Sequence, residues 1–595
     1  MKMILTIDSD YDFNMIYMMA MIIHSHNHGH HINHIKIIVR ITVQHAYLQN
    51  LLHSFATKVQ QFLHLTNFST MKACKTFTLA LFALLFLACD TSKKTVATPG
   101  KDDGIIEVTF LQMNDVYEIS PSSDNSGGLA RVATLRKELL AKNPNTITVL
   151  AGDFISPSVI GTLKFEGKRI RGRQMVDVLN TLGLDWVVFG NHEFDYDDLA
   201  DLQARLDEST FSWLAGNVRL KGSTWTQQFF KNRNGGTEIV PDNKVMMLKD
   251  ADGTTLNLGI FGVLVDTGKK PWAEYSDWQT SAQKSYAELQ PAADVIVALT
   301  HLNAVDDKKL SALLPSVPLI MGGHDHDNQI YKIGTATVAK ADANAKTVYI
   351  HTLRIDKNKH TTTVKSELRK INGKIADDPM TAAVIAKWEK IKNESLGSAG
   401  FDPEKPVKAL SQPLDCRDAF TRHQPAPVGH DITAAMLAVS KNNPEVAILN
   451  SGSIRVDDVL SGTLTELDIV RMLPFGGSIV EVEMRGSLLR KTLETGLGNK
   501  GAGGYLQTSG VRKDETSGKW FVGANALDDN KLYHVTLPEF LLTGNELNMG
   551  FLKASLDANN KSTNADIPTI VKADPKNKAD LRNDVRLALI DYWRK

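Results

Sequence analysis

Residues 186–195 read WVVFGNHEFD, an apolar run that breaks abruptly into glycine, amide, imidazole and carboxylate residues. Short runs of β-branched and aromatic residues that end in glycine are typical of buried strands. The glycine permits a tight turn and a close approach of the backbone to a ligand. The side chains of Asn191, His192, Glu193 and Asp195 then follow, all of them types that bind metals or carry protons. One such strand end is common and decides nothing by itself.

The same arrangement recurs four more times along the chain. The apolar runs and the polar ends that follow them are Ile105–Met113 before Asn114-Asp115, Thr146–Leu150 before Gly152-Asp153, Val295–Leu299 before Thr300-His301, and Val317–Met321 before Gly322-Gly323-His324-Asp325-His326. Helical stretches, among them Leu129–Leu140 and Gln174–Thr181, separate the runs. The pattern predicts strands of an α/β sheet whose polar ends converge at one edge.

The residue types at these ends point to metal chemistry. Carboxylate and amide oxygens suit hard divalent ions, and imidazole adds affinity for Zn, Mn or Fe. Two ions roughly 3.5–4 Å apart, bridged by a carboxylate, can clamp a phosphoryl group and activate water near neutral pH. The pattern therefore favours a two-metal phosphoesterase.

The five strand ends resemble the signature of the calcineurin-like metallophosphoesterases, in the version of the 5′-nucleotidase family, from about Ile105 to the C-terminus. The resemblance implies a four-layer α/β/β/α sandwich followed by a second α/β domain that binds substrate. It also implies two divalent ions (Zn, Mn or Fe) and attack by a metal-activated water. The residues that match the family's first-metal ligands are Asp115, Asp153 and His326, with Asp153 bridging, and those that match the second are Asn191, His301 and His324. His192 and Asp195 match the catalytic dyad, in which the histidine stabilises the phosphoryl group and the aspartate orients the histidine.

Tyr117 departs from the family pattern. The family reads Asn-Asp-x-His, whereas this chain reads Asn114-Asp115-Val116-Tyr117. A phenol ligates iron in purple acid phosphatases, so Tyr117 is one candidate metal ligand. The alternative is a packing residue, which leaves the first site one ligand short.

The C-terminal half carries the expected substrate contacts. Asn450-Ser-Gly-Ser-Ile-Arg455 follows the apolar run Val446–Leu449, and two phenylalanines stand in glycine-containing loops. By resemblance, Arg422 and Arg455 contact phosphate and substrate, Asn450 contacts substrate, Phe475 and Phe540 sandwich a nucleobase, and Glu546 replaces an aspartate that contacts ribose. The loops around Arg422 and Glu546 depart from the family pattern. A nucleoside monophosphate is thus the first expectation, with a cyclic nucleotide, a nucleotide sugar or another phosphomonoester as alternatives.

The first hundred residues indicate targeting rather than fold. Met71-Lys-Ala-Cys-Lys and the apolar run Phe77–Ala88 resemble a signal peptide, and Phe86-Leu87-Ala88-Cys89 resembles a bacterial lipobox with Cys89 as the lipidated residue. Residues 1–70, which hold nine of the 18 histidines, are interpreted as a gene-model extension rather than a metal-binding tail. The expected location is extracytoplasmic, with a lipid anchor as the only contact with the membrane.

The expected organisation follows from these segments: extension 1–70, signal peptide 71–89, tether 90–103, metallophosphoesterase domain 104–375, linker helix 376–400 and substrate-binding domain 401–595. The linker rests on the helically spaced Met380, Val384, Ile385, Trp388 and Ile391, with an end at Gly397. The resemblance implies a domain rotation near Leu396–Phe401.

Composition excludes some functions. The formal net charge is zero, which gives no electrostatic reason to expect binding to a nucleic-acid polymer. Three cysteines cannot form a disulfide framework, and Cys416 is expected to be a buried thiol. No protein partner is implied. The competing class is a nucleotide-binding lipoprotein without turnover, motivated by Tyr117 and by the altered loops.

Overall fold

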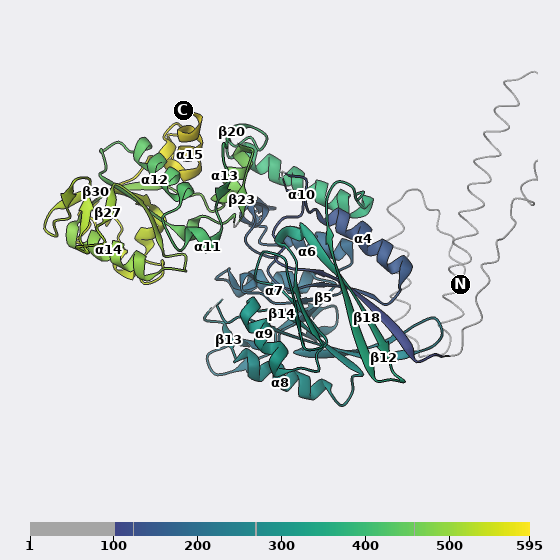
Figure 1. Cartoon of the computed structure of the whole chain (residues 1–595). Coiled ribbons are helices and arrows are strands. Elements are labelled where there is room, and N and C mark those ends of the chain that lie inside the picture. Colours follow the sequence, from purple (N-terminus) through teal and green to yellow (C-terminus); the bar gives the residue numbers. More distant parts are fainter. Residues whose placement is uncertain (1–101, 123, 268–269, 457) are drawn as a thin grey trace, which may run out of the picture. The chain divides into compact units, whose positions relative to one another are not determined.

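The computed structural model describes residues 102–122, 124–267, 270–456 and 458–595 (Figure 1). The expected signal peptide, the lipidated Cys89 and the histidine-rich segment lie outside these residues. Within the described ranges, no helix combines the length and the apolarity that crossing a bilayer requires.

Two six-stranded sheets form the first domain, with strand orders β19-β18-β1-β2-β5-β6 and β11-β12-β14-β15-β17-β16. The first sheet comprises β1 (Ile105–Met113), β2 (Thr146–Leu150), β5 (Trp186–Val188), β6 (Ser212–Leu214), β18 (Thr347–Asp356) and β19 (Thr361–Lys370). The second comprises β11 (Asn243–Lys249), β12 (Thr255–Leu264), β14 (Val295–His301), β15 (Leu319–Gly322), β16 (Gln329–Ile333) and β17 (Ala336–Lys340). In both sheets four neighbouring strands are parallel, β1-β2-β5-β6 and β12-β14-β15-β17.

Alternating side chains place one core between the sheets and one outside each of them. Val108 and Phe110 of β1 pack with Ile260 of β12 and Val297 of β14 between the sheets. On its other face β14 presents Ile296 to the core that includes residues of helices α8 (Trp278–Leu289) and α9 (Ala304–Leu313). The corresponding helices of the first sheet are α4 (Leu129–Lys142), α6 (Arg173–Leu182) and α7 (Leu199–Glu208). The expected α/β/β/α sandwich is confirmed.

The five predicted strands form close to their expected bounds. The expectation of a single sheet edge is wrong, because β1, β2 and β5 belong to one sheet whereas β14 and β15 belong to the other. Strand β14 also continues to His301, so this histidine lies in the strand and not after it.

Helix α10 (Pro379–Ser398) forms where the linker helix was expected. The Asp378 side chain caps it by accepting a hydrogen bond from the backbone N–H of Thr381, and Pro379 occupies its first turn. Trp388 is fully buried. Two details were wrong: Met380 is 69% exposed and so lies off the buried stripe, and Gly397 lies inside the helix, which ends at Ser398.

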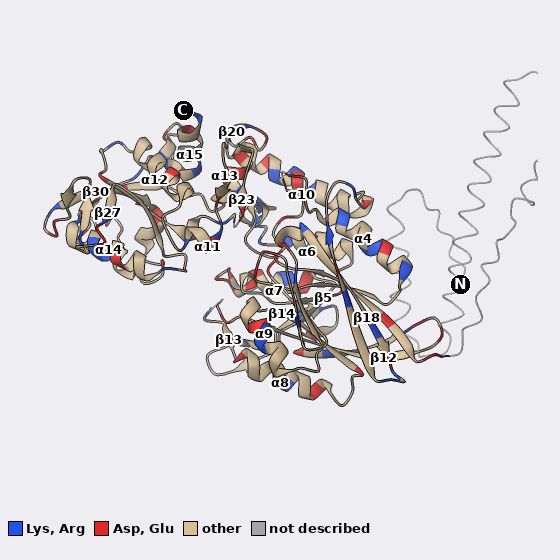
Figure 2. Ribbon diagram, in the orientation of Figure 1, with Lys and Arg blue, Asp and Glu red and all other residues tan. Residues whose placement is uncertain are grey.

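The second domain is an α/β unit around a five-stranded sheet of order β26-β22-β30-β25-β31. The strands are β22 (Val446–Asn450), β25 (Ile479–Arg485), β26 (Leu506–Ser509), β30 (Leu532–Pro538) and β31 (Thr569–Val571). Helices α12 (Pro427–Val439) and α15 (Val585–Arg594) contribute to the core on one face, and α14 (Gly486–Gly498) contributes to the core on the other. Figure 2 shows acidic and basic residues interspersed along the ribbon of both domains, which agrees with the balanced composition.

Candidate metal centre and its flanking dyad

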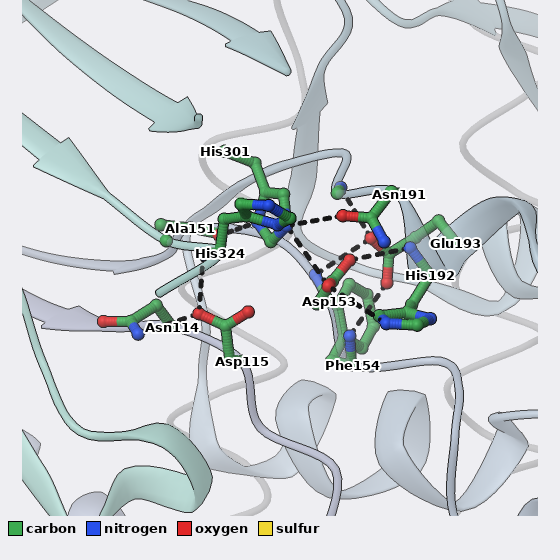
Figure 3. A network of polar contacts seen from close by, with 12 residues as sticks. Asn114, Asp115, Ala151, Asp153, Phe154, Asn191, His192, Glu193, His301 and His324 are labelled. Atoms are coloured by element: carbon green, nitrogen blue, oxygen red, sulfur yellow. Dashed lines mark hydrogen bonds and ion pairs between the residues drawn. The ribbon is translucent and has the colours of Figure 1, made fainter. Parts of the chain in front are cut away.

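Three predicted metal ligands stand in left-handed backbone conformation. The φ angles are 54° at Asp115, 57° at Asp153 and 78° at His324. This region costs a residue other than glycine of order 1–3 kcal/mol, and it persists where surrounding contacts impose it, often at functional sites. Each of the three follows closely on the end of β1, β2 or β15, where the turn aims its side chain back across the sheet ends (Figure 3).

The residues predicted for the second metal lie close together. The ligand atoms of Asp153, His301 and His324 all lie within 4.8 Å of one another. His301 Nε2 is 3.1 Å from Asp153 Oδ2 and 3.2 Å from Asn191 Oδ1. His301 Nδ1 lies 2.7 Å from the carbonyl oxygen of Ala151. Because a carbonyl only accepts, Nδ1 carries a proton, and Nε2 is the nitrogen that a cation would bind in place of a proton.

The residues predicted to bind the first metal meet at Asp115. Asp115 Oδ2 accepts hydrogen bonds from the Asn114 side chain at 2.8 Å and from the His324 backbone at 2.9 Å. Asp115 Oδ1 is buried and accepts no hydrogen bond from the described residues, and it lies 3.6 Å from His326 Nε2. A buried carboxylate oxygen without a donor is costly, and a divalent ion would satisfy it. The residues present therefore fit a metal.

Tyr117 reaches this group. Its hydroxyl lies 3.1 Å from His326 Nε2 and donates to Asp153 Oδ2 at 3.3 Å. The phenol thus stands among the residues predicted to bind the first metal, in contact with both Asp153 and His326.

The predicted dyad is formed. His192 Nδ1 lies 2.9 Å from Asp195 Oδ2, and Ser156 Oγ donates to the same oxygen at 2.8 Å. The backbone N–H of His192 donates to Asp153 Oδ1 at 2.8 Å, which ties the dyad to the carboxylate that is expected to bridge the metals. Burial opposes charge on His192, but the carboxylates of Asp195 and Asp153 outweigh it and raise its pKa.

The pKa values of the predicted ligands shift in different directions. Burial raises the pKa of Asp115, whereas burial together with the neighbouring His301 lowers the pKa of His324 to about 4. Both residues are thereby pushed toward their neutral forms. Burial also opposes charge on Asp153, but His301 and His192 outweigh it and hold the pKa of that carboxyl below its ordinary value. Asp153 in turn raises the pKa of His301 to about 9, against the effect of burial. Strongly shifted groups of this kind cluster at functional sites.

Glu193 is a residue that the sequence analysis left without a role. Its buried carboxylate accepts hydrogen bonds from the backbone N–H groups of Gly190, Asp153, Phe154 and Ile155, at 2.6 to 3.2 Å. It therefore fixes the turn after β2 against the turn after β5, and with them Asp153 and His192 (Figure 3). The signal in the sequence that could have identified Glu193 is its position between His192 and Asp195 in the motif at residues 186–195.

The predicted substrate residues of the second domain fall into separate groups. Asn450 donates to Glu546 Oε2 at 2.6 Å, and Arg422 forms an ion pair with Asp418. Phe475 and Phe540 are 62% and 46% exposed. Arg455 lies 3.4 Å from Asp195 Oδ2 and lines a cleft together with Tyr117, His192, His326 and Asp418. Of the predicted set, Arg455 is thus the residue that approaches the dyad.

Comparison with known proteins gives both domains a match. Residues 108–328 match the family described as calcineurin-like phosphoesterase, and residues 407–553 match the family described as 5′-nucleotidase, C-terminal domain. The 5′-nucleotidase of Bos taurus is 25% identical over 509 residues, which cover 74% of this chain and 83% of that protein. The snake venom 5′-nucleotidase of Gloydius brevicauda is 25% identical over 536 residues, 78% of this chain and 86% of that protein.

A solved structure shares the fold. The 5′-nucleotidase precursor from Thermus thermophilus is 22% identical and superposes with a TM-score of 0.60, covering 82% of this chain and 96% of that one. The two domain matches occur in the same chain in this order, and the relatives span both. The chain therefore belongs to the 5′-nucleotidase family of calcineurin-like metallophosphoesterases and is a 5′-nucleotidase-like hydrolase.

Proposed function

We propose that this protein is an extracytoplasmic two-metal phosphohydrolase that releases phosphate from nucleotides. The observation that carries the proposal is the position of Asp153, whose Oδ2 lies 3.1 Å from His301 Nε2 and 3.3 Å from the Tyr117 hydroxyl, which itself lies 3.1 Å from His326 Nε2. Asp115, Asp153 and His326 would hold one ion, and Asn191, His301 and His324 would hold the second, with Asp153 shared. Bound divalent ions would supply Lewis-acid stabilisation of the phosphoryl oxygens and a nucleophile at neutral pH.

The residues of the chain itself account for the rest of the reaction. His192, whose Nδ1 is engaged by Asp195, presents a protonated imidazole to the charge that develops on the phosphoryl group. Asp195 orients the ring and stabilises its positive charge. Arg455, at the cleft that contains His192 and His326, supplies a second cation that can bind the phosphate of the substrate.

The test is phosphate release from AMP with added Mn²⁺ or Zn²⁺, comparing the wild type with His192→Ala. We expect the variant to lose about 10²–10⁴-fold in rate, the range typical of a positioned proton-carrying group. Equal rates would remove His192 from the mechanism. If the wild type instead binds AMP by calorimetry and releases no phosphate with any metal, the protein is a nucleotide-binding lipoprotein without turnover.

A second candidate substrate class is favoured by one contact. Glu546 stands where the family carries an aspartate that contacts ribose. Here its Oε2 accepts a hydrogen bond at 2.6 Å from Asn450, which is itself a predicted substrate residue. A pocket whose polar groups satisfy each other is less suited to ribose. Comparing nucleoside monophosphates with cyclic nucleotides, nucleotide sugars and simple phosphomonoesters separates the two candidates, and the ester with the highest kcat/KM identifies the class.

The proposed location rests on the leader sequence. Cleavage before Cys89 and lipidation of that residue would place both domains outside the cytoplasm, joined to the membrane by the tether 90–103. Labelling cells with a radioactive fatty acid tests this. We expect label in the wild type and none in Cys89→Ala, whereas equal labelling of the two proteins would exclude Cys89 as the anchor.

A further inference from the structure

Lys340, the last residue of β17, is a fully buried lysine close to the metal centre. Its ammonium nitrogen lies 2.6 Å from the carbonyl oxygen of Leu302 and 2.5 Å from that of Gly323. Leu302 follows His301, and Gly323 precedes His324. One cation therefore touches both segments that supply the histidines predicted to bind metal.

Two carboxylates complete the surroundings of the ammonium. Asp307 Oδ2, on α9, is 2.7 Å away and fully buried, and Asp325 Oδ2, between His324 and His326, is 2.9 Å away. The second oxygen of Asp307 accepts from Thr300 Oγ1 at 2.6 Å, so this carboxylate also holds the residue before His301. Four oxygens thus surround a group with three N–H donors.

The backbone makes room for this cluster. A Cβ atom on Gly322 would lie 2.6 Å from Asp307 Oδ2 and 3.2 Å from Lys340 Nζ, so an alanine there would collide with the ion pair. Gly322, the last residue of β15, therefore leaves room for the buried ion pair. The charges of Lys340, Asp307 and Asp325 sum to minus one, which suits a cluster beside a site for cations.

We propose that Lys340 is a positioning residue of the metal centre, whose ammonium group holds the segments at 300–302 and 323–326 at the separation that lets His301 and His324 bind one ion. The inference rests on the proposed metal site and adds to it a residue that contacts neither metal nor substrate. Outer groups that orient metal ligands typically contribute about 10–100-fold to metal affinity.

The test measures metal binding without substrate. Calorimetric titration with Mn²⁺ and the visible absorption spectrum of the Co²⁺-loaded protein are compared between the wild type, Lys340→Met, and the double variant Lys340→Met/Asp307→Asn. The double variant keeps the net charge of the cluster and leaves no fully buried carboxylate unpaired. It therefore tests the loss of the ammonium contacts to Leu302 and Gly323 separately from a change in charge. We expect both variants to bind the second ion about 10–100-fold more weakly, with a changed Co²⁺ spectrum.

Lys231 provides a matched control. It is 2% exposed, donates to the carbonyl oxygen of Phe211, and pairs with Glu238 at 3.8 Å. Lys231→Met removes a buried ammonium of the same domain and should lower the free energy of unfolding while leaving metal affinity and the Co²⁺ spectrum unchanged. Unchanged metal affinity and an unchanged Co²⁺ spectrum in Lys340→Met/Asp307→Asn would overturn the proposal.

A milder pair of variants serves if the lysine variants fail to fold. Asp325 is 29% exposed at its side chain, so Asp325→Asn weakens the tie to the loop without burying a new charge. Asp327→Asn removes an exposed carboxylate of the same loop and is the control. Weaker binding of the second ion in Asp325→Asn alone supports the proposal, and equal affinities in the two variants contradict it. These experiments measure metal binding and not turnover. A wild-type protein that fails to hydrolyse AMP would therefore contradict the proposed function without deciding the role of Lys340.

Discussion

At the scale of single residues, one oxygen of Asp195 contacts three polar side chains around the dyad. Asp195 Oδ2 lies 2.9 Å from His192 Nδ1, 2.8 Å from Ser156 Oγ and 3.4 Å from Arg455 Nη2. The negative charge of Asp195 raises the pKa of His192 against the opposing effect of burial. Replacing the carboxylate with an amide of the same shape should therefore separate its charge from its size.

We expect Asp195→Asn to reduce kcat about 10²–10⁴-fold. Loss of the carboxylate lowers the pKa of His192, so the protonated imidazole is lost at lower pH and the alkaline limb of the rate profile shifts toward acid. Phosphate release measured between pH 5 and pH 10 checks both effects. Asp197→Asn, which alters a carboxylate that is 98% exposed two residues away, is the control. A variant profile that overlays the wild type would exclude the assigned role.

Tyr117 offers a second prediction at this scale. Because its hydroxyl lies 3.1 Å from His326 Nε2 and 3.3 Å from Asp153 Oδ2, we expect it to contribute to the first-metal site. Tyr117→Phe keeps the ring and removes only the oxygen. It should weaken binding of the first ion about 10-fold, the low end of the loss expected for a group that supports a metal. Metal content after dialysis, measured by elemental analysis, decides: full occupancy of both sites in the variant assigns the ring to packing.

At the scale of elements, a polar network joins the two sheets through Gln112, three residues before Asp115. Gln112 of β1 donates to the carbonyl oxygens of Gly322 and Ala339 in the other sheet, and its own oxygen lies 2.8 Å from His351 Nε2. His351 Nδ1 lies 2.8 Å from Ser366 Oγ on β19. Since the Gln112 oxygen can only accept, His351 donates through Nε2. Burial favours the neutral ring, in which Nδ1 accepts from the Ser366 hydroxyl.

This network predicts a sensitivity to acid. Burial lowers the pKa of His351 to about 3, from about 6.5 in the unfolded chain. The unfolded state therefore binds the extra proton first, and the stability contributed by the neutral ring is present above pH 6.5 and lost as pH falls. Between pH 7.5 and pH 5 the loss amounts to about 2 kcal/mol. Urea unfolding should show His351→Gln losing about 2 kcal/mol less than the wild type over this interval. Equal losses in the two proteins would contradict the prediction.

The elements also show how far sequence reasoning reaches. Strands β1 and β2 form with the predicted bounds because their signals are local, an apolar run closed by a polar or glycine turn. Their division from β14 and β15 into separate sheets could not be read from such runs, since a buried parallel strand has the same pattern in either sheet. Met380 shows the same limit, because helical spacing places a residue on a face without saying how far the core extends along it.

The candidate site divides in the same way. The ligand types stand in motifs, so Asp115, Asp153 and His301 could be named from the sequence, and the structure brings them together. Lys340 and Glu193 could not be assigned roles, because each acts through backbone groups that chain topology brings to it. Lys340 reaches a carbonyl 38 positions away, and Glu193 reaches an amide 40 positions away. Long-range backbone contacts leave no periodic or compositional trace in the sequence.

At the scale of the whole molecule, helix α10 connects the two domains. Trp388 in its middle belongs to the core of the first domain, and Leu396 near its end belongs to the core of the second. Gly400, with φ of 90°, turns the chain directly after the helix. We expect substrate held by the second domain to be delivered to the metals by a rotation about this connection.

Cross-linking the domains tests the rotation. Lys346 of the first domain and Asp458 of the second form an ion pair at 2.6 Å, so cysteines at these positions can be joined by a short, cleavable bismaleimide. Cys416 is fully buried and burial raises the pKa of its thiol, which protects it from the reagent. Turnover should fall at least about tenfold on cross-linking, because conformational steps of this kind gate the reaction, while metal content stays constant. Cleaving the linker should restore the rate, and Lys346→Cys alone should tolerate the reagent. A cross-linked protein that hydrolyses substrate at the wild-type rate would show that the domains need not move.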